Sequence, residues 1–256
     1  MQARRCLFCE CSLQGSRSKE HIFPKWLIEF MGIEKLPIRS EHHERSGLEM
    51  ERKDVRDAPA PARTEGRVCS KCNNGWMSAL ESVAMPILKP LIEGTANLYA
   101  CKGEEAAIVG RWAAKTAYML NAASAYPLKV PHFHRVSIFE GRIPNDVFVF
   151  GFPFSTEELH WSQHTEWEFL NARLEDLPRE EELEKYTYKI AVRLRHLSLI
   201  VVWNGLHEWA VVAPRSWPLL GKDRPVQRAD DQYPPGAFMF PIIGLSLAMK
   251  QVMLTH

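Results

Sequence analysis

The 256-residue sequence predicts an α+β fold, with a cysteine-stapled N-terminal module followed by a helical segment and a mainly antiparallel, β-rich domain. Three observations support this prediction. Two C-x-x-C pairs bracket the first quarter of the chain, the clearest helical periodicity follows them, and short apolar runs between turn residues fill the second half. With 46% hydrophobic residues, the chain is long enough for two domains. We expect their boundaries at 1–92 and 93–256.

The four paired cysteines predict a structural zinc site. Each C-x-x-C pair presents two sulfurs from one tight turn, so two pairs complete a tetrahedral shell. The ligands would be Cys6, Cys9, Cys69 and Cys72. The two pairs are much further apart than in the usual two-knuckle ribbon, which implies a folded or looped segment between them. Cys11 extends the first pair to C-x-x-C-x-C, so Cys11 is an alternative to Cys9 as a zinc ligand. Cys101 is expected to be structural.

Composition excludes several classes of protein. A net charge of +1 gives no global field that would attract nucleic acid. No signal peptide precedes Cys6, and a disulfide scaffold would be smaller and richer in cysteine. The apolar stretch 237–249 is interrupted by Pro241 and is too short to cross a bilayer. We therefore expect a soluble protein of a reducing compartment, cytoplasmic and without a membrane partner.

The first half of the chain predicts three helices and one exposed insertion. Residues 25–31 read as one or two helical turns that stop at Gly32. Residues 34–66 are highly charged and are expected to form an exposed insertion, in which the adjacent pair His42 and His43 is either incidental or metal-binding. Residues 77–92 have helical spacing with two internal prolines, which predicts a kinked or broken helix. Residues 104–125 form the clearest helical pattern, with acidic residues at its start.

After Pro131 the periodicity changes to that of strands. The β-rich runs are 135–139, 147–152, 167–172, 188–194, 198–203 and 208–212. The Asn204-Gly205 turn predicts a hairpin between 197–203 and 209–211. The acidic segment 177–185 reads as a surface linker or a short helix. The proline-rich tail from residue 216 gives no readable pattern.

Chemistry-bearing residues lie between and directly after the cysteine pairs. Glu20 and His21 occur in the segment Glu-His-Ile-Phe-Pro, and Asn73 follows the last cysteine. An imidazole near its ordinary pKa can take a proton from water, while carboxylate and amide oxygens suit a hard divalent ion. Successive residues of a regular strand point to opposite faces, so Glu20 and His21 face one site only if the local backbone is bent.

The order C-x-x-C, E-H-I-x-P and C-x-x-C-N resembles the zinc-bracketed branch of the HNH (ββα-metal) endonucleases. The resemblance covers residues 1–85. It implies a structural Zn²⁺, a catalytic Mg²⁺ or Mn²⁺ held by Glu20 and Asn73, and His21 as the general base. Glu81, two helical turns after Asn73, would be a third metal ligand. The commonest family sequence has aspartate at the position of Glu20, whereas the related E-H-I-x-P branch also has glutamate.

The resemblance implies hydrolysis of DNA phosphodiesters, with RNA as an open alternative and a role in restriction or phage defence by analogy. Phosphate contacts would come from Arg17, Lys19, Lys25 and Lys71, which fit ordinary surface charges equally well. A homodimer stays open.

Two alternatives remain. The zinc module is a non-catalytic platform that binds nucleic acid or protein, in which Glu20 and His21 support the fold and Asn73 caps a helix. Alternatively, residues 130–256 enclose a pocket for a ligand that regulates the nuclease.

Overall fold

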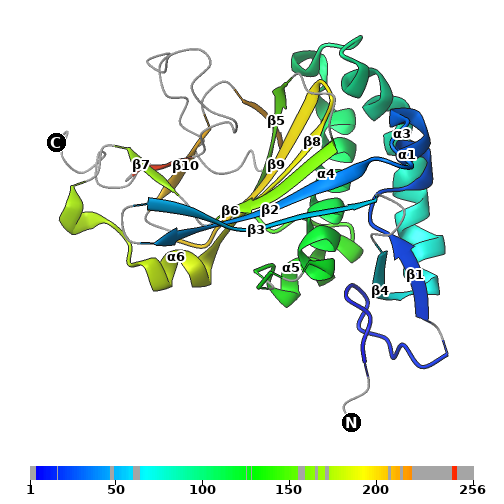
Figure 1. Ribbon diagram of the computed structural model, residues 1–256, viewed down its shortest axis with the longest axis horizontal. Helices are drawn as coiled ribbons and strands as arrows, with labels where there is room; N and C mark the ends of the chain where they lie inside the picture. Colours follow the sequence, from blue (N-terminus) through cyan, green and yellow to red (C-terminus); the bar gives the residue numbers. More distant parts are fainter. Residues whose placement is uncertain are drawn as a thin grey trace.

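A computed structural model of the chain shows a mixed α+β fold, as the sequence predicts, with a largely antiparallel central sheet (Figure 1). The described residues are 4–15, 17–46, 49–59, 64–124, 126–127, 129–154, 159–164, 167–170, 173–206, 209–213, 216–220 and 244–246.

The central sheet has seven strands in the order β11-β5-β9-β8-β6-β2-β3. Neighbouring strands are antiparallel except β2 and β6, which run parallel. In spatial order the strands are β11 (Trp217–Leu220), β5 (Val147–Pro153), β9 (Leu197–Asn204), β8 (Thr187–Leu194), β6 (Leu159–His164), β2 (Pro37–Ser46) and β3 (Glu49–Pro59).

The central strands are nearly continuous apolar runs because both faces of the sheet are covered. Along β9 every residue is buried. Leu199 and Val201 belong to the larger hydrophobic cluster on one face, whereas Ile200 and Val202 belong to a smaller cluster on the other. This alternation is the expected consequence of the two-residue period of a strand.

The smaller cluster is shared with a second sheet and a short helix. This sheet has the order β10-β12-β7, from β10 (Ala210–Val212), β12 (Gly244–Ser246) and β7 (Glu168–Leu170). Helix α6 (Glu180–Tyr186) adds Leu183 to the same cluster. In Figure 1, β7, β10 and α6 lie on the side of the sheet away from α4.

Helix α4 (Gly103–Ala123) connects the sheet with the N-terminal elements. It contacts β5, β8, β9 and β11 of the sheet, and also β4 (Thr64–Cys69) and α3 (Ser78–Glu93). Gly110 allows β11 to lie close, because a Cβ at this position would come within 2.4 Å of Leu220 Cγ. The prediction of a helix over 104–125 is confirmed for residues 104–123.

The remaining helices are short. They are α1 (Lys25–Met31), α2 (Ser70–Cys72), the π-helical turn η2 (Asn73–Met77), the 3₁₀ turns η3 (Leu98–Ala100) and η4 (Leu174–Asp176), and α5 (His132–Phe139). Helix α1 ends where the sequence predicts, because Gly32 adopts the left-handed conformation with φ of 64°. Helix α3 runs through Pro86 and Pro90, so the helix is not broken at either proline.

The N-terminal elements form two antiparallel strands followed by a helix. Strand β1 (Arg17–His21) pairs with β4, with Arg17 opposite Cys69 and His21 opposite Thr64. Strand β4 then leads through α2 and η2 into α3. We call β1, β4, α2, η2 and α3, with the preceding loop 4–15, the cysteine module.

The expectation that 34–66 forms an exposed insertion is wrong in β2 where its side chains are described, because Ile38, Ser40, Glu41 and His42 are buried. Strands β2 and β3 form a long antiparallel pair, and β2 joins the central sheet through β6. Hydrogen bonding between β2 and β6 therefore connects the first and second halves of the chain, across residue 92. The composition of residues 34–66 does not predict that β2 pairs with β6, because β6 lies far away in the sequence.

Two strand predictions are also wrong. Residues 135–139 belong to α5, whose buried residues His134, Arg135 and Ile138 have helical spacing. The hairpin between 197–203 and 209–211 does not form, because β9 already pairs with β8 and β5 while β10 pairs with β12. Strand β6 was missed in the sequence. The tail from residue 216 contributes β11 and β12, and its other residues lie outside the described ranges.

Among the described residues, none of the helices has the length and apolarity needed to cross a bilayer.

Candidate metal centre

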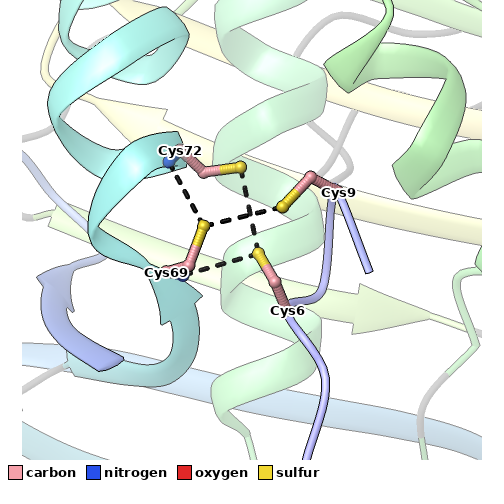
Figure 2. A group of neighbouring side chains, drawn as sticks. All are labelled: Cys6, Cys9, Cys69 and Cys72. Carbon is pink, nitrogen blue, oxygen red and sulfur yellow. Dashed lines mark hydrogen bonds between the residues drawn. The ribbon is translucent and has the colours of Figure 1, made fainter. Parts of the chain in front are cut away.

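The structure brings the four predicted zinc ligands together. The Sγ atoms of Cys6, Cys9, Cys69 and Cys72 all lie within 4.8 Å of one another. Figure 2 shows the four sulfurs turned toward one centre, two from the N-terminal loop and two from the start of the helix. In the described part of the chain, this is the single group of three or more His, Cys, Asp and Glu residues close enough to hold a metal.

The spacing of the sulfurs fits zinc. A Zn–S bond of 2.3 Å in a tetrahedral shell separates the sulfurs by about 3.8 Å. The Sγ atoms of Cys6 and Cys72 are 3.9 Å apart, and those of Cys9 and Cys69 are 3.5 Å apart. The backbone N–H groups of Cys69 and Cys72 donate to the sulfurs of Cys6 and Cys69, both at 3.4 Å. These contacts hold the sulfurs in place as acceptors.

The thiols also interact with one another. The Sγ atoms of Cys6 and Cys72 share a hydrogen bond, which lowers the pKa of Cys6 to about 4 and raises the pKa of Cys72 above its ordinary value. A thiolate therefore forms most readily at Cys6, and the thiolate is the form that binds a metal.

Asn73 connects the helical end of the cysteine module to β1. Its Nδ2 donates to Ser18 Oγ at 3.3 Å, and Ser18 Oγ in turn donates to the carbonyl of Val68 at 3.3 Å. Asn73 begins the π-helical turn, in which Gly75 has non-helical φ and ψ of −96° and −111°. π-helical turns are rare and often occur at functional sites. Asn73 thus lies against the strand that carries Glu20 and His21.

Glu20 is half-buried and lies near two charged residues of the helices. Burial raises the pKa of the Glu20 carboxyl above its ordinary value, Lys115 opposes this shift, and Glu81 adds to it. The pairing of β1 with β4 is irregular between Ser18 and Glu20. The extra residue lies on β4, because Ser18 to Glu20 pairs with Val68 to Glu65, so the irregularity bends β4 and not β1.

His21 is exposed at the end of β1, opposite Thr64. The next two residues, Ile22 and Phe23, are fully buried. Glu20 is half-buried and His21 is exposed, so the two residues differ in burial, as neighbours on a strand do.

Glu81 accepts three hydrogen bonds from outside the cysteine module. Trp26 Nε1 and Trp112 Nε1 donate to Oε2 at 2.9 and 2.8 Å, and Lys115 Nζ donates to Oε1. Lys115 is 1% exposed, so this is a buried ion pair. The donors come from α1 and α4, and Glu81 therefore fastens the module to the rest of the molecule.

Sequence reasoning did not assign a role to Lys115. The sequence does indicate that Lys115 is buried, because this residue lies among the apolar residues on one face of the clearest predicted helix. Charged residues are rarely fully buried unless they are paired.

The other candidate residues lie in varied surroundings. Lys71 is exposed, and the exposed Lys25 pairs with Glu29 at 3.3 Å. The side chains of Arg17, Lys19 and His43 lie outside the described part of the structure. His42 is buried and stacks on Tyr126, with 4.6 Å between ring centroids, so it does not lie in a solvated loop as expected.

Comparison with protein-family models, curated proteins and solved structures found no match for this chain.

Proposed function

We propose that the chain is a metal-dependent endonuclease of the HNH type, which hydrolyses DNA phosphodiester bonds. The observation that carries the proposal is the arrangement of the cysteine module. Two antiparallel strands are followed by a helix, and four clustered cysteines join the loop before β1 to the turn between β4 and this helix. Strand β1 carries Glu20 and His21 next to the helical segment that begins with Asn73.

The cysteine cluster would hold a structural zinc. Zinc would fix the N-terminal loop to the turn between β4 and α3, because each of these segments supplies two sulfurs. Glu20 and Asn73 would hold the second metal, Mg²⁺ or Mn²⁺, with oxygen atoms on neighbouring segments. When bound, such an ion neutralises phosphate charge and lowers the pKa of a bound water.

His21 would act as the general base. Its exposed imidazole can reach a solvent-borne substrate and accept a proton from the attacking water. We leave Glu81 out of the metal site, because its carboxylate already accepts three hydrogen bonds and pairs with Lys115.

Exposed Lys71 and Lys25 are suited to contact the phosphate backbone. Contacts of this kind carry no sequence information, so the proposal includes no sequence preference. RNA stays an alternative substrate, and a role in restriction or phage defence rests on the resemblance.

A second candidate function is a non-catalytic, zinc-dependent module that binds nucleic acid or protein. It is favoured by the surroundings of Glu20, because burial and the neighbouring Glu81 both favour the neutral carboxyl, which is a poor metal ligand. The two candidates differ in metal content, since a nuclease holds a second, exchangeable divalent ion.

Plasmid cleavage by the purified, zinc-loaded chain tests the proposal. We expect cleavage with Mg²⁺ or Mn²⁺ and a loss of about 10²- to 10⁴-fold in His21→Ala, because the general base is removed. Zinc content, measured on both proteins, should be unchanged. His196→Ala removes another exposed histidine, in the turn between β8 and β9, and serves as the matched control, with unchanged cleavage.

Two results would reject the nuclease. One is no metal-dependent cleavage of duplex, single-stranded or RNA substrates by wild type with zinc in place, which favours the binding module. The other is equal cleavage by wild type and His21→Ala, which assigns the activity to a contaminant or to other residues.

A further inference from the structure

A fifth cysteine lies beside the four-cysteine cluster. The Sγ atoms of Cys9 and Cys11 are 3.3 Å apart, closer than the Sγ atoms of Cys6 and Cys72 or those of Cys9 and Cys69. Cys11 does not belong to the group of four sulfurs that surround the metal position. It is therefore in contact with the zinc ligand Cys9 and lies outside the four-sulfur shell.

The loop that carries the two residues keeps them together. The N–H of Cys6 donates to the carbonyl of Cys11 at 2.9 Å, and the N–H of Leu13 donates to the carbonyl of Arg4 at 3.0 Å. Between the two cysteines, Glu10 has a φ of +57°, a left-handed conformation that is uncommon for a residue with a side chain. The contact between Cys9 and Cys11 is thus set by a closed turn of the backbone.

Exposure differs sharply among the five cysteines. Cys6, Cys69 and Cys72 are at most 2% exposed, Cys9 is half-buried, and Cys11 is exposed. An oxidant in solution therefore meets Cys11 first and Cys9 second. The other three ligands are protected.

We propose that Cys9 and Cys11 form an oxidation site, at which a hydroperoxide converts the two thiols to a disulfide and removes Cys9 from the zinc shell. A disulfide has an S–S bond of 2.03–2.05 Å, so the two sulfurs need to approach by about 1.3 Å. Such a movement takes Cys9 away from its position in the cluster. Three sulfurs then remain for zinc, which leaves the metal open to water or to a chelator.

The chemistry balances with one hydroperoxide. The Cys11 sulfur attacks one peroxide oxygen and gives up its thiol proton, the O–O bond breaks, and a sulfenic acid and an alcohol or water form. The Cys9 thiolate, leaving zinc, then attacks the Cys11 sulfur and expels hydroxide, which takes a proton to become water. The two cysteine sulfurs lose two electrons, and the peroxide gains them. A dithiol reductant reverses the step by thiol–disulfide exchange.

The test uses the full-length, zinc-loaded chain and hydrogen peroxide as the oxidant. Zinc release is followed with a colorimetric chelator, and disulfides are located by mass spectrometry of peptides under non-reducing conditions. We expect wild type to form one disulfide between Cys9 and Cys11 and to release its zinc, with both changes reversed by a dithiol and added Zn²⁺. Cys11→Ser should release zinc at least about tenfold more slowly, because sulfenic acid formation then depends on less exposed thiols.

Cys101→Ser removes a buried free cysteine outside the cluster and is the matched control, with oxidation like that of wild type. Cys11→Ala repeats the test without a side-chain hydroxyl. Equal zinc release from wild type and both Cys11 variants would overturn the proposal, as would a disulfide that joins any other pair. The location of the disulfide is read independently of zinc content and of cleavage, so a failed nuclease assay does not affect the result.

Discussion

A buried ion pair between Lys115 of α4 and Glu81 of α3 holds the cysteine module in place. Lys115 is 1% exposed and its ammonium pairs with Glu81, which also accepts hydrogen bonds from two tryptophans. Removing one member of a buried ion pair leaves an unpaired charge, which is strongly destabilising. The pair therefore provides a sensitive test of the packing between α3 and α4.

Lys115→Met should lower the free energy of unfolding by about 3 kcal/mol, because it leaves the Glu81 carboxylate without its cation. Chemical denaturation followed by circular dichroism measures this. The double variant Lys115→Met, Glu81→Leu should recover part of the loss, since both charges are gone. Lys25→Met, which breaks an exposed pair, should change stability by less than about 0.5 kcal/mol. An equal effect of the buried and the exposed substitution would contradict the structure.

His134 belongs to a buried polar chain between α5 and the sheet. Its Nδ1 lies 3.0 Å from the hydroxyl of Tyr188, which donates to the hydroxyl of Tyr118 at 3.1 Å. Its Nε2 lies 3.9 Å from Asp146. Burial lowers the pKa of His134 to about 4, and Asp146 opposes this shift. The imidazole is thus neutral in the folded protein at neutral pH.

This shift predicts how stability depends on pH. In the unfolded chain His134 has an ordinary pKa of about 6.5, so the unfolded state binds more protons than the folded state between about pH 6.5 and 4. Stability should therefore fall by up to about 3 kcal/mol as the pH decreases through this window. Thermal or chemical denaturation of wild type and His134→Gln at several pH values measures the difference.

The variant should lose this part of the pH dependence, whereas His132→Gln, at an exposed position, should keep it. The same pH profile in wild type and His134→Gln would show that His134 is not buried as described.

At the residue scale, the sequence predicts the metal-binding cysteines better than it predicts the hydrogen-bond partners of a buried carboxylate. The four cysteines were identified because C-x-x-C spacing and thiolate chemistry are local properties. The partners of Glu81 come from α1 and α4, and tertiary packing brings them together, so no local pattern around Glu81 reveals them.

At the scale of elements, the cysteine cluster joins the N-terminal loop to the turn between β4 and α3, which also meet where Phe8 packs on Trp76. Cys69 ends β4 and Cys72 ends the first helical turn, while Cys6 and Cys9 lie in a loop without a helix and with a single isolated bridge. Metal binding to such a site supplies folding free energy directly. The start of α3 and the N-terminal loop should therefore depend on zinc.

Removal of zinc by a strong chelator under reducing conditions should lower Tm by about 10 °C or more, because a lost structural zinc is worth several kcal/mol. Cys69→Ser should have the same effect without a chelator. Differential scanning fluorimetry with metal analysis measures both. Cys101→Ser should keep its zinc and its Tm close to that of wild type. An unchanged Tm after complete zinc removal would reject a structural role.

The elements that the sequence predicts correctly are those whose signal is local. Strands β5, β8 and β9 are continuous apolar runs, and α4 has strong helical periodicity. Strands β2 and β3 are charged, and their assignment depends on pairing with each other and with β6. Helix α5 has strand-like composition, yet packing against α4 decides its conformation.

At the scale of the whole molecule, α4 lies between the central sheet and the cysteine module (Figure 1). The larger hydrophobic cluster includes residues of both, from Phe8 and Leu88 to Val149 and Tyr188. Arg195 also donates to the carbonyl of Met31 at 2.8 Å. Apolar surface of the module is thus buried by residues after position 92.

Residues 1–92 alone should not form a stable fold, even with zinc, because α4 and strand β6, which pairs with β2, are missing. Circular dichroism and a thermal melt of this fragment measure its stability, with the full chain as control. A zinc-loaded fragment with cooperative unfolding would show that the module is autonomous.

The measurement that tests the central claim most directly is Mn²⁺ binding to the zinc-loaded chain by electron paramagnetic resonance. The nuclease proposal predicts one exchangeable Mn²⁺ per chain, with affinity reduced by more than about tenfold in Glu20→Gln and in Asn73→Ala. Glu29→Gln, at an exposed carboxylate of α1, should bind Mn²⁺ as wild type does. No Mn²⁺ binding, or binding unchanged by Glu20→Gln, would contradict the account and favour a zinc module without catalysis.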